Sequence, residues 1–381
     1  MYKHETYRRY HRRTDGNRAR LPLRPTLLLL TVLMVGIFIG AVSARRGEEA
    51  PANSLVSLES SVPDETPAVN GLFVPSDNSA KDLTKSFETP ASTGCNVVSL
   101  PSSRLTVSID GNPVEMELED YLVGVVGGEM SASSEPAALQ AQAVAARTFT
   151  VLHMQGRAKC KSGCTVCDDH RCCQAYRTDS ELRAAWGAQY DEYFSRISTA
   201  VSSTAGLVVT FDGQPISALY HASSGSATES SEEVFAVALP YLVSVDSFEG
   251  EAEMVSVQEF PLSEVVSKLN SVYTEANIKI PLSKNDFSVW GRTDSGRVQL
   301  IQIGDSVITG SAMRAALGLK SAAFTVEHDD STITFTCQGY GHGVGMSQVG
   351  ANEMAKDGAD FEEILAHFYT GTAISRLDYS S

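Results

Sequence analysis

The feature of this 381-residue chain that most restricts its fold is a run of uncharged, mostly apolar residues at Thr26–Ala44. About 20 apolar residues form a helix long enough to cross a bilayer. Basic residues dominate 1–25, and only Arg45 and Arg46 follow the run closely. Because basic flanks remain on the cytoplasmic side, we predict a single-pass cell-membrane protein with its N-terminus in the cytoplasm and its C-terminal part extracytoplasmic.

A cleaved signal peptide is the alternative, because Val42–Ala44 offers the small residues that precede a cleavage site. The apolar run is longer than the usual apolar part of a signal peptide, which favours a retained anchor. Both interpretations export the rest of the chain, so the expected compartment does not depend on the choice.

Four segments follow from composition. Residues 1–25 form a basic tail, 26–44 the transmembrane anchor, 45–94 a linker and 95–375 a folded domain. The linker is rich in Ser, Pro and acidic residues and has few aromatics, so it cannot bury enough apolar surface to order itself.

Charge restricts the class of partner. The whole chain carries a formal net charge of −16, although residues 1–25 are basic. An acidic surface is a poor match for phosphate backbones, which are bound by Lys and Arg. We therefore expect no nucleic-acid partner, whereas polysaccharides, read by hydrogen bonds and stacking, remain possible.

The pattern of apolar residues predicts an α+β domain of mixed helices and short antiparallel strands, in two lobes around a groove. A hairpin is expected around Asp110–Pro113, and a second one around Asp212–Gln214. Helices are expected from Leu118, over Ala137–Met154, over Pro261–Leu269 with the proline at its first position, and over 346–357 and 360–369. Further strands are expected at 297–303, 306–309 and 332–337.

One acidic residue stands out near the end of the first helix. Gly127 and Gly128 precede Glu129, and apolar Val126 and Met130 flank them. Apolar surroundings disfavour the charged form of a carboxyl, which keeps a glutamic acid protonated for acid catalysis. The alternative is an ordinary solvent-exposed residue at a helix end.

Two later stretches are richer in polar or glycine residues than a core requires. The stretch 220–228 runs from Tyr220 into a turn dense with hydroxyls, which either presents hydrogen-bond groups to a ligand or is an ordinary turn. The stretch 339–348 alternates glycines around Tyr340 and His342. Glycine at this density lets the backbone approach a ligand or another strand closely, and we favour a cleft wall.

Together these stretches resemble a known family. The blocks Leu118–Leu122, Glu129-Met130, Ala141–Thr148 and Gly341–Gln348 are similar to the signature blocks of stage II sporulation protein D, whose domain is shared with an amidase enhancer protein. The resemblance covers residues 97–375. Two features depart from the usual pattern: Ser131 follows Glu129-Met130 where proline is common, and Gln140 replaces a lysine.

The resemblance implies a peptidoglycan lytic transglycosylase. Such an enzyme cleaves peptide-stripped glycan strands to 1,6-anhydro-ended products during engulfment of the forespore in sporulation. It also implies two partners, a sporulation-stage amidase and a polytopic membrane protein. By position, the catalytic acid is Glu129, and no cofactor is needed for catalysis. The resemblance also implies a glycan-binding groove, and five residues in the family-like stretches are candidates to line it: Arg147, Tyr220, Ser224, His342 and Gln348.

A cysteine cluster forms a separate candidate site. Cysteines at gaps of two to four residues suit tetrahedral zinc, and some members of the resembled family hold zinc just before a stretch that Cys173–Tyr176 matches. We expect a structural zinc ion with Cys167, Cys172 and Cys173 as ligands, Cys160 or Cys164 as the fourth, and His170 as a spare. Disulfide bonds are the alternative, since an extracytoplasmic compartment permits them.

Two other functions remain open at this stage. A non-catalytic, wall-binding activator of a cell-wall amidase would carry the same blocks without cutting. A zinc hydrolase is disfavoured because the cysteine cluster includes no HExxH-type base.

Overall fold

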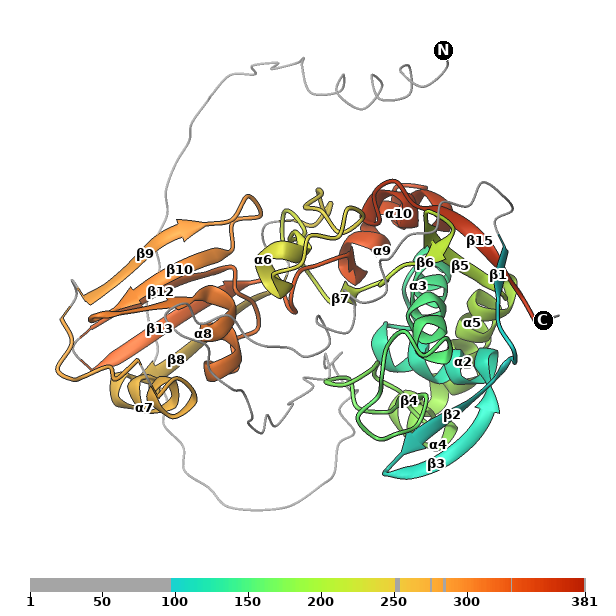
Figure 1. Cartoon of the computed structure of the whole chain (residues 1–381), viewed down its shortest axis with the longest axis horizontal. Coiled ribbons are helices and arrows are strands. Elements are labelled where there is room, and N and C mark those ends of the chain that lie inside the picture. Colours follow the sequence, from blue (N-terminus) through green and yellow to red (C-terminus); the bar gives the residue numbers. More distant parts are fainter. Residues whose placement is uncertain (1–96, 251–253, 275, 284–285, 330, 380–381) are drawn as a thin grey trace, which may run out of the picture. The chain divides into compact units, whose positions relative to one another are not determined.

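The computed structural model describes residues 97–250, 254–274, 276–283, 286–329 and 331–379. The predicted tail, anchor and linker lie outside these residues. Among the described helices, none has the length and apolar character needed to cross a membrane. The described part mixes helices with several small sheets (Figure 1), which confirms the α+β class.

Two hydrophobic cores organise the described residues. The first core is built from residues in two segments, 98–245 and 344–377. The second core is built from residues between Leu262 and Cys337. The middle of the sequence therefore forms its own core, and the chain returns to the first core at its end. The described residues thus contain two cores, and the two lobes around a groove stay a prediction.

The first core opens with the expected hairpin. Strand β2 (Arg104–Ile109) pairs antiparallel with β3 (Asn112–Glu117), and Ile109 faces Asn112 across the turn. Asp110 and Gly111 have φ angles of 49° and 78°. Positive φ at both turn residues fits the right-handed twist of the flanking strands, and Asp-Gly supplies it at low cost. The two-residue strand β4 (Val166–Cys167) joins the other edge of β2 in parallel.

Two helices carry the first family-like blocks of the sequence into this core. Helix α2 (Leu118–Glu129) has acidic residues in its first turn, where the helix dipole favours them. Helix α3 (Pro136–Met154) begins with proline at its first position and is buried along most of its length. Its alanine-rich face lets α2, α5 and α9 pack closely, as Figure 1 shows for α2 and α5.

The rest of the first core consists of short helices and a four-stranded sheet in the order β1-β15-β5-β6. The second expected hairpin is confirmed only in part, because its second strand is two residues long. The helices and strands of this part of the first core are α4 (Asp179–Trp186), α5 (Tyr190–Ser203), β1 (Val97–Ser99), β5 (Leu207–Phe211), β6 (Gln214–Pro215), α9 (Gln348–Lys356), α10 (Phe361–Phe368) and β15 (Ala373–Asp378).

The second core lies between two three-stranded sheets, in the orders β11-β10-β9 and β12-β13-β8, and two helices. The expected strands at 297–303, 306–309 and 332–337 are confirmed within one residue. Pro261 ends strand β8 and caps the following helix instead of starting it, which corrects that detail. The elements are β8 (Val255–Pro261), α7 (Leu262–Val272), β9 (Phe287–Arg292), β10 (Val298–Ile303), β11 (Ser306–Thr309), α8 (Gly310–Leu317), β12 (Phe324–His328) and β13 (Thr332–Gln338).

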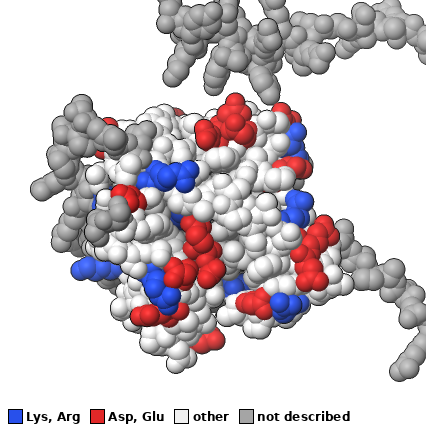
Figure 2. All heavy atoms as spheres, turned by 90° about the vertical axis from the view of Figure 1, so that its right-hand side faces the viewer, with Lys and Arg blue, Asp and Glu red and all other residues white. Residues whose placement is uncertain are grey.

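Charges of both signs lie on the surface of the described residues. Figure 2 shows one face on which Lys and Arg form separated groups with Asp and Glu beside them. On this face the basic residues form no continuous track of the kind that a phosphate backbone requires, and the lack of a nucleic-acid partner stays a prediction.

Candidate active site

Glu129 is the last residue of helix α2 and keeps only part of its side chain exposed. Burial raises the pKa of its carboxyl to about 7. The Ala175 N–H lies 2.6 Å from Oε1 and, together with the nearby polar side chains of Tyr220 and Gln348, partly opposes that rise in pKa. A carboxyl with a pKa near neutrality can both give and take a proton at physiological pH. The raised pKa is the effect expected for a carboxyl in buried surroundings.

Glycines on one face of α2 explain how the Ala175 N–H reaches the acid. A Cβ on Gly124 would lie 2.3 Å from the Tyr176 ring and 2.7 Å from the Arg177 carbonyl oxygen. One helical turn later, a Cβ on Gly128 would lie 3.1 Å from the Ala175 carbonyl oxygen. The absence of side chains at these two positions lets the segment 175–177 lie directly on the helix, beside Glu129.

Three glutamines and a tyrosine complete the polar surroundings of the acid. Tyr220 donates to the Gln174 side-chain oxygen over 2.8 Å, and Gln348 donates to the Gln142 side-chain oxygen over 3.3 Å. Gln142, Gln174 and Gln348 are all buried. Gln142, Gln174 and Ala175 were not singled out in the sequence, although Gln174 and Ala175 lie in the stretch after Cys173 that carries the resemblance.

A short strand pair brings the second and third stretches together at this point. Strand β7 (Tyr220–His221) pairs in parallel with β14 (Met346–Ser347). Tyr220 precedes the hydroxyl-rich turn, and Gln348 follows β14 as the first residue of α9. The pairing therefore places one residue from each stretch beside Glu129.

The alternating glycines serve protein packing. Gly339, Gly341, Gly343 and Gly345 all have positive φ. A Cβ on Gly345 would lie 2.1 Å from the Leu219 carbonyl oxygen, and one on Gly343 would lie 2.2 Å from an Arg297 nitrogen. Of the two possibilities raised by this motif, close approach to another protein segment is the one realised, and no cleft wall is needed to explain it.

A buried carboxylate that the sequence did not reveal holds these segments together. Glu249 accepts hydrogen bonds from the Ser223 and Ser347 hydroxyls and from the Ser224 N–H, the last over 2.8 Å. A fourth donor, the Gly225 N–H, lies at 3.3 Å. Glu249 thus ties the hydroxyl-rich turn to the start of α9.

Comparisons with known proteins agree with these blocks. Residues 112–211 match the sequence model of the family described as "SpoIID: Stage II sporulation protein". Stage II sporulation protein D of Bacillus subtilis (strain 168) is 37% identical over 299 residues, which are 76% of this chain and 84% of that protein. The protein of the same name from Bacillus amyloliquefaciens is 36% identical over 68% of this chain and 75% of its own length.

The chain belongs to the stage II sporulation protein D family. It is also similar to a protein named "Amidase enhancer" from Bacillus subtilis (strain 168), with 30% identity over 67% of this chain and 40% of that protein. The family resemblance drawn from the sequence blocks is therefore confirmed.

Within this stage II sporulation protein D domain, Arg147 occupies a structural position. Its side chain has no exposed surface. Two of its nitrogens, Nε and a terminal one, contact the two Glu119 oxygens at 2.9 and 2.6 Å, and the guanidinium also donates to the Leu207 and Val201 carbonyl oxygens. A fully buried arginine cannot contact a glycan, so the expectation that Arg147 lines a groove is corrected.

Ser224 is likewise buried and structural. Its hydroxyl bonds the Nε2 atom of His221, whose Nδ1 lies 3.2 Å from the Val344 carbonyl oxygen. That carbonyl requires a proton on Nδ1, so the Ser224 hydroxyl donates to Nε2. Burial holds the pKa of His221 well below its ordinary value, and the ring is neutral. Ser224 therefore fixes a histidine tautomer and does not face a substrate.

Tyr220 and Gln348 lie beside Glu129, whereas His342 lies among other partners. Its Nδ1 accepts from the Val344 N–H over 3.0 Å, and its ring contacts His221 and Phe235. Of the predicted substrate-binding residues, Tyr220 and Gln348 are thus the two that the structure brings to the acid. Two surface hollows among the described residues are lined by residues other than Glu129, Tyr220 and Gln348, so neither corresponds to the expected groove.

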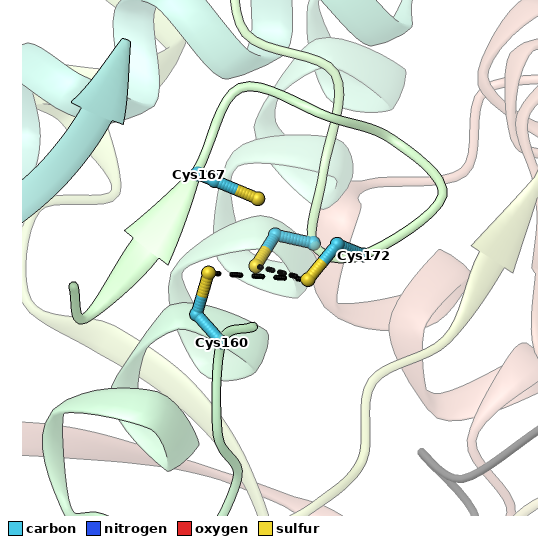
Figure 3. A group of neighbouring side chains, drawn as sticks. Cys160, Cys167 and Cys172 are labelled. Carbon is cyan, nitrogen blue, oxygen red and sulfur yellow. Dashed lines mark hydrogen bonds between the residues drawn. The ribbon is translucent and has the colours of Figure 1, made fainter. Parts of the chain in front are cut away.

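The cysteine cluster converges on one point (Figure 3). The sulfur atoms of Cys160, Cys167, Cys172 and Cys173 all lie within 4.8 Å of one another. The distances from Cys172 to Cys160 and to Cys173 are both 3.9 Å. A tetrahedral zinc ion with bonds of about 2.3 Å to sulfur gives edges of about 3.8 Å, whereas a disulfide requires about 2.05 Å. These four thiols therefore fit zinc, and Cys164 and His170 fall outside the group.

Proposed function

We propose that this protein is a membrane-anchored peptidoglycan lytic transglycosylase that cleaves peptide-stripped glycan strands to 1,6-anhydro-ended products. The observation that carries the proposal is the state of Glu129, a partly buried carboxyl with a pKa near 7, positioned where three family blocks meet. The membership of the chain in a sporulation family supports a role in forespore engulfment.

The chemistry requires one carboxyl. Protonated Glu129 gives its proton to the glycosidic oxygen as the bond from that oxygen to C1 breaks. The carboxylate then removes the proton from the C6 hydroxyl of the same sugar as the C6 oxygen bonds to C1. Ordinary glycosidases use a second carboxylate, often to activate a water, but an internal attack needs none. The buried carboxylates among the described residues, Glu229 and Glu249, are both held by serine and other donors.

Product analysis tests the proposal. Peptide-free glycan strands are incubated with the full-length protein or with Glu129→Gln, and the products are identified by mass spectrometry. Anhydro-ended fragments from the wild type alone support the transglycosylase and assign its acid. Strand binding without fragments from either protein would instead favour a wall-binding activator of an amidase, which the similarity to the amidase enhancer makes the alternative.

We also propose a structural zinc ion bound by Cys160, Cys167, Cys172 and Cys173. When bound, such an ion supplies folding free energy and no chemistry, because a closed four-thiolate site leaves no open position. Metal analysis of purified protein should give one zinc per chain. Cys172→Ser should lose the metal, whereas Cys164→Ser, altered in the same loop but outside the cluster, should keep it.

The proposed place of action is the outer side of the cell membrane, with 26–44 as the anchor. We propose a sporulation-stage amidase and a polytopic membrane protein as partners, since an amidase that removes peptides would produce the stripped strands this enzyme requires. Co-purification from sporulating cells, compared with a chain lacking residues 1–44, tests both the anchor and the partners.

A further inference from the structure

The last turn of α2, which carries the candidate acid, is weak by its own sequence. Gly127 and Gly128 directly precede Glu129, and each glycine inside a helix costs up to about 1 kcal/mol relative to alanine. Neither Met130 nor Ser131 has positive φ, so the helix does not end in the left-handed residue that closes many helices. The last turn also has no basic residue to interact with the helix dipole. Contacts from other elements are therefore needed to hold this turn.

One set of such contacts comes from the segment 175–177. The Ala175 N–H bonds the acid over 2.6 Å, and the segment lies against Gly124 and Gly128. These contacts act on the acid and on the helix before it. The chain that continues from Glu129 into α3 needs a support of its own.

Arg196, on helix α5, provides that support. Its Nε donates to the Ala132 carbonyl oxygen over 2.8 Å, and a terminal nitrogen donates to the Ser134 carbonyl oxygen over 2.6 Å. Both acceptors lie in the connection 131–135 between α2 and α3, and Ala132 is three residues beyond Glu129. Charged donors make stronger hydrogen bonds than neutral ones. Because the guanidinium is planar and rigid, two bonds from it fix both distance and orientation.

The part of the connection that Arg196 contacts is buried. Ala132 is 3% exposed and Ser134 is 9% exposed, so solvent does not readily replace a lost donor to their carbonyl groups. The Ser134 N–H donates to the Ser131 carbonyl oxygen over 3.0 Å, which closes a turn within the connection. Removal of the guanidinium is therefore expected to open this turn.

The far end of the connection is fixed independently of Arg196. The Glu135 N–H donates to the Asn352 side-chain oxygen over 2.8 Å. Pro136 then begins α3, which is buried along most of its length. Because this end is held by α9 and α3, a movement that follows the loss of Arg196 is directed toward the end of α2 and Glu129.

We propose that Arg196 is a positioning residue that holds the last turn of α2 and thereby places Glu129. The inference rests on the proposed function, because it concerns where the acid stands relative to the glycosidic oxygen. Arg196 acts through the backbone that follows the acid, from 130 to 134. Small displacements of a catalytic group cost about 10²-fold in rate, so a cation on a neighbouring helix controls proton transfer without taking part in it.

Arg196→Met tests the proposal, because methionine keeps an aliphatic stem but donates to neither carbonyl. Amide hydrogen exchange of the full-length protein, read by mass spectrometry, should become about tenfold faster in 126–135 and stay unchanged in the second core. With peptide-free glycan strands, kcat should fall by about 10- to 100-fold. The KM should change by less than about threefold, because the groups that bind the strand stay in place.

Arg183→Met is the matched control. Arg183 lies on α4, which also packs against α2. Its guanidinium contacts the Asp179 carboxylate at 2.7 Å and the Tyr190 ring at 3.9 Å, so it pairs with side chains and not with the connection 131–135. This variant should leave both kcat and the exchange of 126–135 unchanged. Equal acceleration in the two variants would show a general loosening of the helices and would overturn the proposal.

Arg196→Lys separates geometry from charge and keeps the test valid where Arg196→Met does not fold. The ammonium group retains the charge but lacks the planar fork that reaches two carbonyl oxygens at once. We expect faster exchange in the same residues and a loss of kcat smaller than in Arg196→Met. Exchange and cleavage equal to wild type in Arg196→Lys would refute the role of the two-carbonyl contact.

Hydrogen exchange also keeps this inference distinct from the proposed function, because it needs no substrate. Unchanged exchange in 126–135 of folded Arg196→Met would overturn the role of Arg196. A wild type that does not cut glycan, combined with faster exchange in that variant, would refute the proposed function alone.

Discussion

Glu129 and Glu249 are both enclosed carboxyls that link segments far apart in the sequence, but their surroundings differ in what they leave possible. Glu249 accepts from two serine hydroxyls and two backbone N–H groups. Glu129 accepts one short hydrogen bond, from the Ala175 N–H. The neighbouring side chains of Tyr220 and Gln348 donate to Gln174 and Gln142. A carboxyl whose oxygens are taken up by protein donors serves to hold segments together, whereas one with few donors is available for proton transfer.

The largest expected effect concerns catalysis. Glu129→Gln should reduce glycan cleavage by about 10²- to 10⁴-fold, because positioned proton transfer contributes rate enhancements of that size. Its thermal unfolding should remain cooperative. Initial rates of anhydro-end formation measure the loss, and a variant retaining more than a tenth of the wild-type rate would show that another group supplies the proton.

The second effect is on stability. Glu249→Gln should lower the free energy of unfolding by about 2–3 kcal/mol, because an amide NH2 would face donors that now have an acceptor. Urea denaturation of this variant and of Glu129→Gln tests the contrast. If both lose the same stability, the two carboxyls do not differ in the way the contacts indicate.

The third effect concerns how the acid is positioned. Gly124→Ala places a methyl group where the Tyr176 ring and a backbone oxygen now lie, so the segment that carries Ala175 must move. We expect cleavage to fall by about 10- to 100-fold, since small misplacements cost that much.

Gly127→Ala is the control for this helix. Its methyl group would meet the flexible end of Leu182 at 3.0 Å, and alanine is the better helix former by up to about 1 kcal/mol. This variant should keep most of the cleavage rate. Equal losses in the two variants would indicate a general effect on α2 and not on the segment that crosses it.

The smallest effect is the dependence of stability on pH. The pKa of Glu129 is raised from 4.5 to about 7 in the folded chain, so its contribution is fully present below 4.5 and is lost as the pH rises through 7. Relative to Glu129→Gln, the wild type should lose about 1–2 kcal/mol between pH 4.5 and 8, a value reduced for the partial exposure of the side chain. Urea denaturation of both proteins at a series of pH values measures the difference. The same dependence of the unfolding free energy on pH in both proteins would contradict the raised pKa.

The sequence was sufficient for features whose cause is local. Asp110-Gly111 predicted its turn because few residues adopt positive φ at two successive positions. Pro136 and the alanines after it indicated α3, because proline suits the first position of a helix and alanine is a strong helix former. Glu129 could be singled out because it ends a helix whose apolar residues next to it in sequence, Val126 and Met130, are buried.

Features that depend on distant partners were missed or misassigned. Arg147 looks like a surface cation in sequence, and only its contacts with Glu119, Val201 and Leu207 reveal that it is buried. Glu249 has no periodic pattern around it, and one of its donors is 98 positions away. Polar residues whose role is set by such contacts carry little local signal, which is also why Gln142 and Gln174 were not identified.

The strand pair β7–β14 has a consequence for when this molecule can act. Strands β7 and β14 meet only after the chain has closed a loop of more than a hundred residues, and His221 reaches Val344 across 123 positions. Contacts of such long range form late, because the entropy of closing the loop must be overcome first. A chain synthesised or left intact only to residue 345 would have Glu129 but not β14 or Gln348, so we expect the proposed activity to be lost in it.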